Sequence, residues 1–172
     1  PQDIPKVKEF FQQGATPAER AAVTGEGSGS MYAYRHVGFH GGVLSAWKSG
    51  GYGDIYLVNA NGYIVYSVTK SADFLLQIGD PEVANTGLAK AIAASTAADP
   101  RTDIVSDYEP YGLNGDEPSL FLVRDVRGTV KNPDEIVGYV AIRLDASYFD
   151  GILKNSDDTS GQTFLINDKG LV

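Results

Sequence analysis

Two histidines are the first side chains in this sequence that could hold a metal ion. His36 and His40 are the only histidines, and their spacing of four positions would place both on one face of a helix, as some metal sites do. No Glu follows His36, so the zinc-protease pattern is absent. The sequence offers no identifiable third ligand. We therefore expect two packed or surface histidines and no metal site.

Four acidic residues could in principle supply a general acid and a general base. They are Asp54, Asp73, Asp107 and Glu109. Acidic residues are plentiful in this chain, however, and no spacing shows that these four converge. The sequence also contains no serine elbow, no phosphate-binding glycine loop and no cysteine. We expect no catalytic residues, no cofactor and no enzymatic activity.

Polar and aromatic side chains gather around the second and third expected strands. Ligand pockets are mostly apolar with a few well-placed polar groups, and tyrosine supplies both characters. The predicted ligand-binding residues are Tyr66, Lys70, Asp73, Asp107, Tyr108, Tyr111 and Arg124. The alternative is that the tyrosines pack in the sheet while Lys70 and Asp73 lie in a solvated loop. Arg124 and Arg143, each within an apolar strand, either face solvent or point into a pocket towards a carboxylate.

Composition limits the partners that these residues could serve. The 172 residues carry a net charge of −8, with 42% hydrophobic and 21% charged residues, which is ordinary for one globular domain with smaller additions. The acidic balance opposes binding to nucleic acids or anionic membranes. The chain has no Met at its start, no signal peptide and no long apolar run, and it ends within a repeated motif. We expect it to be a piece excised from a longer protein.

The first fifty residues are predicted to be helical. Residues 4–14 place apolar side chains on one face, and Thr16, Pro17 and Glu19 form a capping-box pattern that begins a second helix. Residues 25–30 are a glycine-rich loop. A third helix is expected from Ser30 to Lys48, with a broad apolar face made of Met31, Tyr34, Val37, Leu44 and Trp47.

A β-hairpin over residues 55–69 is the strongest local signal in the sequence. Two runs rich in β-branched and aromatic residues, 55–59 and 63–69, flank the dipeptide Asn61-Gly62. The pattern returns at the end of the chain, because residues 161–172 align without a gap on residues 53–64, with Phe164 at the position of Tyr56. An internal repeat is therefore expected, with its second copy truncated.

The remaining elements complete an α+β fold. Asp80 and Pro81 are expected to begin an alanine-rich helix that runs to about Ser95. Three strands follow over residues 103–108, 119–126 and 135–144, and then a short helix over residues 147–154. Strands that arrive as a hairpin and a meander favour a five-stranded antiparallel sheet with N-terminal helices.

Several short motifs resemble the extracytoplasmic sensor region of bacterial methyl-accepting chemotaxis proteins. They include His40, Tyr52, Asp54, Tyr56, Leu57, residues 66–68, Lys70, Asp73, Phe74, Gly87, Leu88, residues 107–111 and residues 118–121. Such regions are PAS-like Cache domains, often two per receptor. The glycine-rich residues 39–42 depart from this resemblance, since relatives tend to carry Pro and larger residues there. The amino-acid-binding signature of one Cache subgroup is not matched.

The resemblance implies an organisation and a function. Residues 1–50 would be an N-terminal helical region, residues 51–154 a PAS-like Cache sensor domain, and residues 155–172 a linker and the start of a second Cache-like repeat. The chain would be the small-molecule-sensing, periplasmic domain of a membrane-anchored chemoreceptor, forming a homodimer through its N-terminal helices. The alternatives are the same sensor on a histidine kinase or nucleotide cyclase, or a structural or dimerisation module that binds no ligand.

Overall fold

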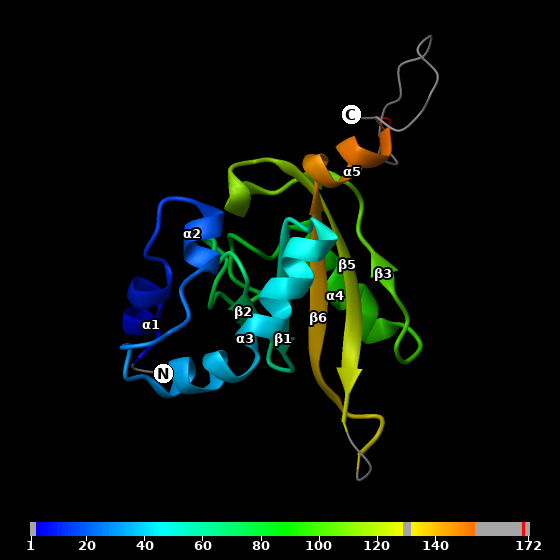
Figure 1. The fold of residues 1–172 in the computed structure, drawn as a ribbon. Helices are drawn as coiled ribbons and strands as arrows, with labels where there is room; N and C mark the ends of the chain where they lie inside the picture. The colour runs from blue at the N-terminus through cyan, green and yellow to red at the C-terminus, as the bar shows by residue number, and fades with distance from the viewer. Residues whose placement is uncertain (1–2, 129–131, 154–169, 171–172) are drawn as a thin grey trace.

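The computed structural model describes residues 3–128, 132–153 and 170, and it shows helices packed on both sides of one sheet (Figure 1). In chain order the elements are α1 (Ile4–Phe11), α2 (Pro17–Ala21), α3 (Met31–Gly50), β1 (Asp54–Asn59), β2 (Ile64–Ser67), α4 (Gly87–Ala97), β3 (Ile104–Val105), β4 (Glu109–Pro110), the 3₁₀ helix η1 (Gly112–Asn114), β5 (Pro118–Arg127), β6 (Ile136–Asp145) and α5 (Ala146–Leu153).

The sheet is antiparallel throughout, with the strand order β2-β1-β6-β5-β3 and with β4 also paired to β5. The predicted α+β class with an antiparallel sheet and N-terminal helices is therefore confirmed. The prediction of five strands is corrected to six: the expected strand over residues 103–108 is shortened to β3 (Ile104–Val105), and an additional short strand, β4 (Glu109–Pro110), follows it along β5. Between them the Ser106 N–H still donates to the Phe121 carbonyl, but the N–H of Phe121 donates to the Ser106 hydroxyl, which itself donates to the Asp107 carbonyl, so a side chain takes over one bond of the backbone ladder there.

The β1–β2 hairpin turns where the sequence predicts. The side-chain oxygen of Asn59 accepts the N–H groups of Asn61 and Tyr63, each at 3.0 Å. Gly62 has a φ of 80°, a conformation that glycine adopts without steric penalty. The second strand is shorter than expected and ends at Ser67.

The helix termini follow the predicted capping at two sites and differ at a third. Thr16 and Glu19 form the capping box of α2, and the Ser30 hydroxyl accepts the N–H of Ala33 at the start of α3. The predicted helix start at Asp80 is wrong. The Asp80 carboxylate accepts the N–H of Gln77, three residues earlier, at 2.8 Å, and α4 begins only at Gly87, after its N-cap Thr86.

The predicted apolar face of α3 is also wrong in its N-terminal half. Met31, Tyr34 and Val37 are 73%, 74% and 55% exposed. The buried face instead carries His36 and His40; Nδ1 of His36 and both ring nitrogens of His40 reach hydrogen-bond partners inside the protein. Figure 1 shows that the two ends of α3 run in different directions.

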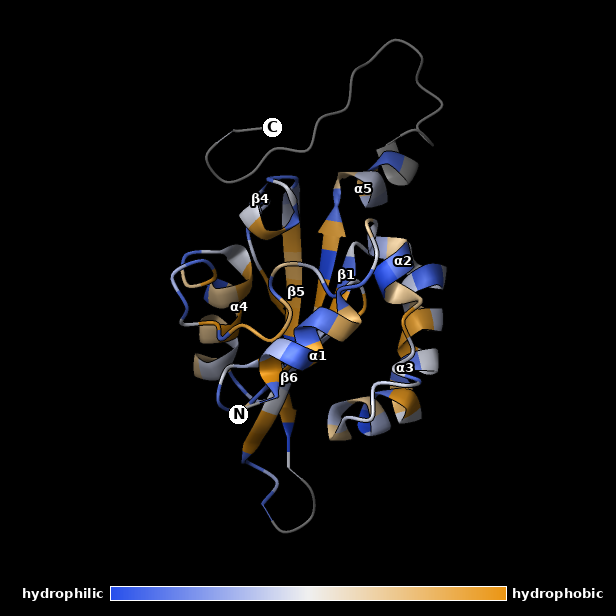
Figure 2. Ribbon diagram, turned by 90° about the vertical axis from the view of Figure 1, so that its left-hand side faces the viewer, coloured by the Kyte–Doolittle hydropathy of each residue, from blue (hydrophilic) through white to orange (hydrophobic). Residues whose placement is uncertain are grey.

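Apolar side chains form three clusters around the sheet. The largest lies between the sheet and α4 and includes Tyr56, Leu88 and Phe121. The others lie on the side of α1, α2 and α3, one around Phe11 and one around Tyr66. Figure 2 shows α4 on one side of the sheet and α2 and α3 on the other.

The helix α5 follows β6 directly, as the sequence predicts. The predicted linker over residues 155–160 and the second repeat over residues 161–172, including Phe164, lie outside the described residues apart from Gly170, so the division into domains stays a prediction. Within the part of the chain that the structure describes, no helix combines the length and the apolar character needed to cross a membrane.

Candidate functional site

A cleft of about 580 Å³ lies where the N-terminal helices meet the sheet. Its wall is built from four parts of the chain: α1 and α2, the end of α3 with the following turn, the loop after β2, and the segment around η1 with the end of β6. The lining residues are Gln12, Pro17, Arg20, Trp47, Tyr52, Gly53, Lys70, Ser71, Ala72, Leu113, Asn114, Glu117, Arg143 and Asp145. Its size falls within the range of small-molecule sites.

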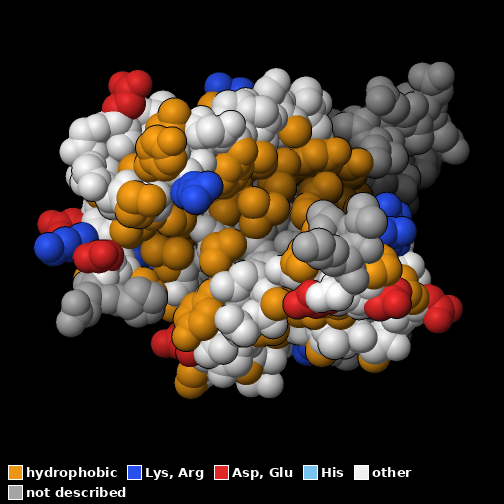
Figure 3. Space-filling model, turned by 90° about the horizontal axis from the view of Figure 1, so that it is seen from below, with side chains coloured by type: hydrophobic (Ala, Val, Ile, Leu, Met, Phe, Trp, Pro, Cys, Tyr) orange, Lys and Arg blue, Asp and Glu red, His pale blue; other side chains and the backbone are white. Residues whose placement is uncertain are grey.

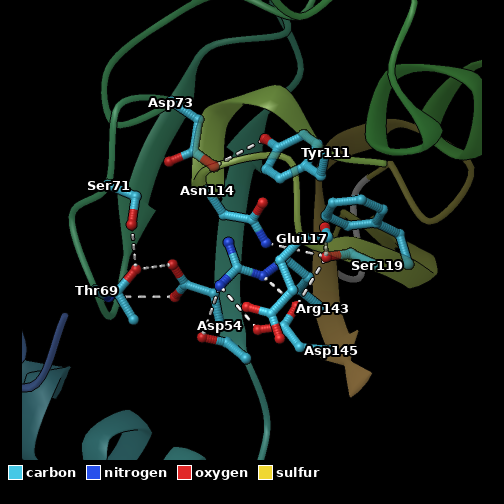
Figure 4. A network of polar contacts seen from close by, with 12 residues as sticks. Asp54, Thr69, Ser71, Asp73, Tyr111, Asn114, Glu117, Ser119, Arg143 and Asp145 are labelled. Carbon is cyan, nitrogen blue, oxygen red and sulfur yellow. Dashed lines mark hydrogen bonds and ion pairs between the residues drawn. The ribbon is translucent and has the colours of Figure 1, made fainter. Parts of the chain in front are cut away.

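A buried ion pair from β6 forms part of this wall. Arg143 and Asp145 are two positions apart on one strand, so their side chains lie on the same face. The Arg143 Nε atom approaches Asp145 Oδ1 at 2.8 Å, and a terminal guanidinium nitrogen donates to Oδ2 at 3.1 Å. The guanidinium also donates to the Tyr56 hydroxyl. Ser119 donates to the Asp145 carboxylate (Figure 4). The Arg143 charge is thus compensated within the protein.

The loop after β2 is held by the buried carboxylate of Asp54. This carboxylate accepts the N–H groups of Val68 and Thr69, at 2.8 and 3.2 Å, and the hydroxyls of Ser67 and Thr69. Figure 4 shows the carboxylate directed at Thr69. These bonds end β2 at Ser67 and fix the wall of the cleft over residues 70–72.

The N-terminal helices are tied to the same loop. The Gln12 amide donates to the carbonyls of Lys70 and Ser71, at 3.1 and 2.8 Å. The Arg20 Nε atom donates to the Thr69 carbonyl at 2.9 Å. In the described structure Arg20 donates only to neutral acceptors and forms no ion pair. The cleft therefore contains a guanidinium that is not hydrogen-bonded to a carboxylate, although its charge acts on the neighbouring Glu19.

Lys70 is fully buried, and its backbone has a φ of 45°, which is strained for a residue with a side chain. Its ammonium donates to the carbonyls of Val68 and Arg20 and lies 5.8 Å from the Phe11 ring centroid and 5.9 Å from that of Tyr66. Burial lowers the pKa of Lys70 to about 8. The ammonium is thus turned into the protein interior.

Asp73 and Tyr111 link the two loops on either side of the cleft. The Tyr111 hydroxyl donates to Asp73 Oδ2 at 2.8 Å (Figure 4), and both side chains are buried. The other Asp73 oxygen has no hydrogen-bond partner among the described residues. Burial, and then the negative charge of Asp54, raise the pKa of Asp73 to about 6.

The two histidines pack inside the N-terminal region, away from the cleft lining. Their rings stack with centroids 4.1 Å apart. His36 contacts the Thr24 carbonyl, and His40 contacts the Tyr66 hydroxyl and the Ala21 carbonyl. Burial lowers the pKa of His36 to about 3 and also lowers that of His40. Nowhere in the described ranges do three or more metal-ligating side chains gather.

The structure brings only some of the predicted site residues together. Lys70 lines the cleft, and Asp73 and Tyr111 lie behind its wall. The other four lie outside the cleft lining. Tyr66 binds His40, Asp107 borders a groove beside α4, Tyr108 packs on Phe149, and the exposed Arg124 pairs with Asp103.

The cleft also uses residues that the sequence did not single out. Gln12, Arg20, Asn114 and Glu117 come from helices and loops whose approach to the sheet has no local signal. Arg143 did carry a signal, because it interrupts an apolar strand, and Asp145 two positions later on the same face is a natural partner for it.

Comparisons with known proteins give little further guidance. No family model matches the chain, and no curated protein matches it. Among solved structures, it is similar to the sensor domain of the histidine kinase DctB from V. cholerae, with 11% identity and a TM-score of 0.46 over 90% of this chain and 52% of that one. The chain spans about half the length of that sensor domain. The likeness is too distant to carry an argument about family or function.

Proposed function

We propose that this chain is the small-molecule-sensing domain of an extracytoplasmic receptor, and that it binds its ligand in the cleft between the N-terminal helices and the sheet. The observation that carries the proposal is the cleft itself, whose polar side chains come from all of its walls. The Arg20 guanidinium donates only to carbonyls and a hydroxyl, and Glu117 is exposed. A small polar ligand would therefore find both a cationic and an anionic group.

The position of the cleft suits a sensor rather than an enzyme. Gln12 and Arg20 contribute to one wall while Arg143 and Asp145 contribute to another, so a ligand that touches both walls would favour one arrangement of the N-terminal helices against the sheet. Such a preference is what shifts a two-state equilibrium, and a coupling of about 1–3 kcal/mol would suffice. We propose no catalytic role.

The finer proposal is that the receptor is a bacterial methyl-accepting chemotaxis protein, anchored in the inner membrane with this domain in the periplasm. It rests on the sequence resemblance around residues 40–74 and 107–121. The same sensor on a histidine kinase or a nucleotide cyclase is the alternative. Sequencing the output segment of the intact gene product would decide between them.

The test of binding is a thermal-shift screen with amino acids, organic acids and other small polar molecules, followed by calorimetry on any hit. A ligand present at 100 times its dissociation constant should stabilise the domain by about 2.7 kcal/mol. Glu117→Gln and Asn114→Ala should weaken binding, while Glu82→Gln, at an exposed position outside the cleft, should not. If no compound binds, or if both cleft variants bind as the wild type does, the cleft is not the ligand site. The alternative of a structural module that binds no ligand would then be favoured.

A further inference from the structure

The first half of α3 turns two histidines inward and leaves apolar side chains outside. His36 and His40 are 1% and 3% exposed, whereas Met31 and Tyr34 are 73% and 74% exposed. Figure 3, which shows the molecule from below, shows hydrophobic side chains gathered over a wide part of that surface. Burying imidazole rings while large apolar groups stay in water is the reverse of what the hydrophobic effect favours. Apolar packing therefore does not account for the two histidines.

The hydrogen bonds of the two rings suit their neutral forms. Carbonyl oxygens only accept, so His36 Nδ1–H donates to the Thr24 carbonyl at 2.9 Å. For the same reason His40 Nε2–H donates to the Ala21 carbonyl, also at 2.9 Å. The remaining nitrogen of a neutral His40 accepts from the Tyr66 hydroxyl at 2.8 Å. The Nε2 atom of His36 is buried and has no hydrogen-bond partner in the part of the chain that the structure describes, so a proton added there would find no acceptor.

The surroundings of the pair disfavour a positive charge. The rings stack with their centroids 4.1 Å apart, so two imidazolium ions would repel each other. The helix α1 contributes the uncharged Phe11 ring, and α2 with the turn after it contributes backbone carbonyls. The titratable groups that face the pair are Tyr32 on α3, Tyr66 on β2 and Lys70 in the loop after β2. Burial, and then the positive charge of Lys70, lower the pKa of both histidines, that of His36 to about 3.

The same hydrogen bonds position one wall of the cleft. Ala21 is the last residue of α2, and Thr24 lies just after that helix. Arg20, next to Ala21, lines the cleft, and its carbonyl oxygen accepts from the Lys70 ammonium. Trp47, which also lines the cleft, packs against the apolar cluster that contains Ala21. Loss of the histidine contacts would therefore loosen α2 and with it the wall that carries Arg20.

We propose that His36 and His40 make this wall of the cleft sensitive to acid. At low pH the contact of α3 with α2 and β2 opens, because histidines that reach water take up protons that the buried rings exclude, and α2 moves away from the cleft. The inference rests on the proposed function only for its consequence, which is weaker ligand binding in acid. The opening itself involves no ligand.

The direction of the effect follows from the two states of His36. The pKa of a histidine in water is about 6.5, whereas burial lowers the pKa of the His36 ring to about 3. The closed arrangement is therefore fully stable above about pH 6.5 and loses stability as the pH falls towards 3. Each pH unit in that window should favour opening about tenfold through His36 alone.

The first test measures amide hydrogen exchange at pH 7, 6 and 5 without any ligand. After correction for the intrinsic exchange rate, protection of α2 and the first half of α3 should fall about tenfold per pH unit, while β5 and β6 stay protected. His36→Asn keeps a donor for the Thr24 carbonyl but takes up no proton, so it should lose most of this dependence. Asp73 also titrates in this range, but it is unchanged in the variant, so comparison at each pH isolates the histidine.

His40→Gln is the second variant and should remove part of the dependence, since its amide can still donate to the Ala21 carbonyl. A wild-type protein in which α2 and α3 are equally protected at pH 7 and pH 5 would overturn the proposal. So would a loss of protection that both variants retain in full.

A second measurement follows the cleft wall through Trp47, the single tryptophan of the chain. Acrylamide, a small neutral quencher of fluorescence, should reach Trp47 more readily at pH 5 than at pH 7 in the wild type, and equally at both in His36→Asn. Equal quenching of the wild type at both pH values would overturn the link between the histidines and the cleft. Because neither measurement uses a ligand, a cleft that binds no compound in the thermal-shift screen would refute the proposed function and leave the acid-sensitive wall intact.

Discussion

Single buried carboxylates organise the region around the cleft. Asp54 supplies acceptors to the backbone and hydroxyls that end β2, and Asp73 holds the loop on the other side through Tyr111. Removing a buried acceptor costs the most stability when several buried donors have no other hydrogen-bond partner. These two residues should therefore have a large effect on how the domain responds to substitution and to pH.

Asp54→Asn should destabilise the domain by roughly 3 kcal/mol, because an amide group would turn a donor towards hydroxyls that now donate to the carboxylate. Asp103→Asn is the matched control. The exposed ion pair between Asp103 and Arg124 should contribute less than about 1 kcal/mol. Urea unfolding of the two variants would measure both changes, and similar losses would contradict the role assigned to Asp54.

Asp73 should make stability depend on pH between about 4 and 6. Its pKa is raised from 3.8 to about 6 on folding, so in this window the folded state holds a proton that the unfolded chain releases. The contribution of this group to stability is therefore full below pH 4 and falls as the pH rises to 6. Asp73→Asn, which can still accept from Tyr111, should gain stability relative to the wild type over that window. Urea unfolding at pH 4, 5, 6 and 7 would show it, whereas parallel curves would contradict it.

At the scale of the elements, glycine plays opposite roles in α3 and β6. Gly138 approaches β1 so closely that a Cβ atom would lie 2.4 Å from the Val58 carbonyl oxygen, whereas Gly41 has open space around it. Gly138→Ala should therefore cost more than about 2 kcal/mol, while Gly41→Ala should stabilise a monomeric sample by about 1 kcal/mol. Thermal unfolding at low concentration would compare them, and two changes of the same sign would refute this reading.

Local chemistry predicted the elements well where the signal lay within a few residues. The Asn61-Gly62 turn and the caps at Thr16 and Ser30 are examples. The start of α4 was mispredicted because an Asp side chain can either cap a following helix or accept a hydrogen bond from a preceding backbone N–H. Here Asp80 accepts from Gln77 and caps no helix. The outer face of α3 was mispredicted because hydropathy ranks Met31 and Tyr34 above His36 and His40, although the histidines find hydrogen-bond partners inside.

The candidate site was harder to predict, because it depends on how distant segments meet. Lys70 lines the cleft and Asp73 and Tyr111 lie behind its wall, and their role in ligand binding stays a prediction. Arg124 and Arg143 read alike in the sequence, since each interrupts an apolar strand. They differ only in which face of the sheet each side chain lies on. Arg124 lies on the solvent-exposed face, whereas Arg143 lies on the face that lines the cleft.

At the scale of the whole molecule, the N-terminal helices and the α4 side have separate apolar clusters. Phe11→Ala should remove contacts with Tyr32, His36 and Phe74 and weaken its own cluster by roughly 3–5 kcal/mol. Hydrogen exchange should then quicken in α1 and α3 while β5 and β6 keep most of their protection.

Leu88→Ala, in the main cluster, provides the comparison. It should raise exchange throughout the described part of the domain, because the sheet and α4 share that cluster. Loss of protection in every element of the Phe11→Ala protein would show instead that the two sides unfold as one unit.

The strand order also affects the rate of folding. Tyr56 on β1 and Arg143 on β6 are hydrogen-bonded although they are 87 positions apart in the chain. During synthesis the β1–β2 hairpin leaves the ribosome long before its central neighbour exists, so one edge of β1 stays unpaired until β6 has been made. Distant pairings of this kind slow folding and leave a strand edge open to other chains. The nascent domain should accordingly depend on chaperones during this interval, and a circular permutant opened between β5 and β6, which places β6 ahead of β1 in the chain, should fold faster than the natural order.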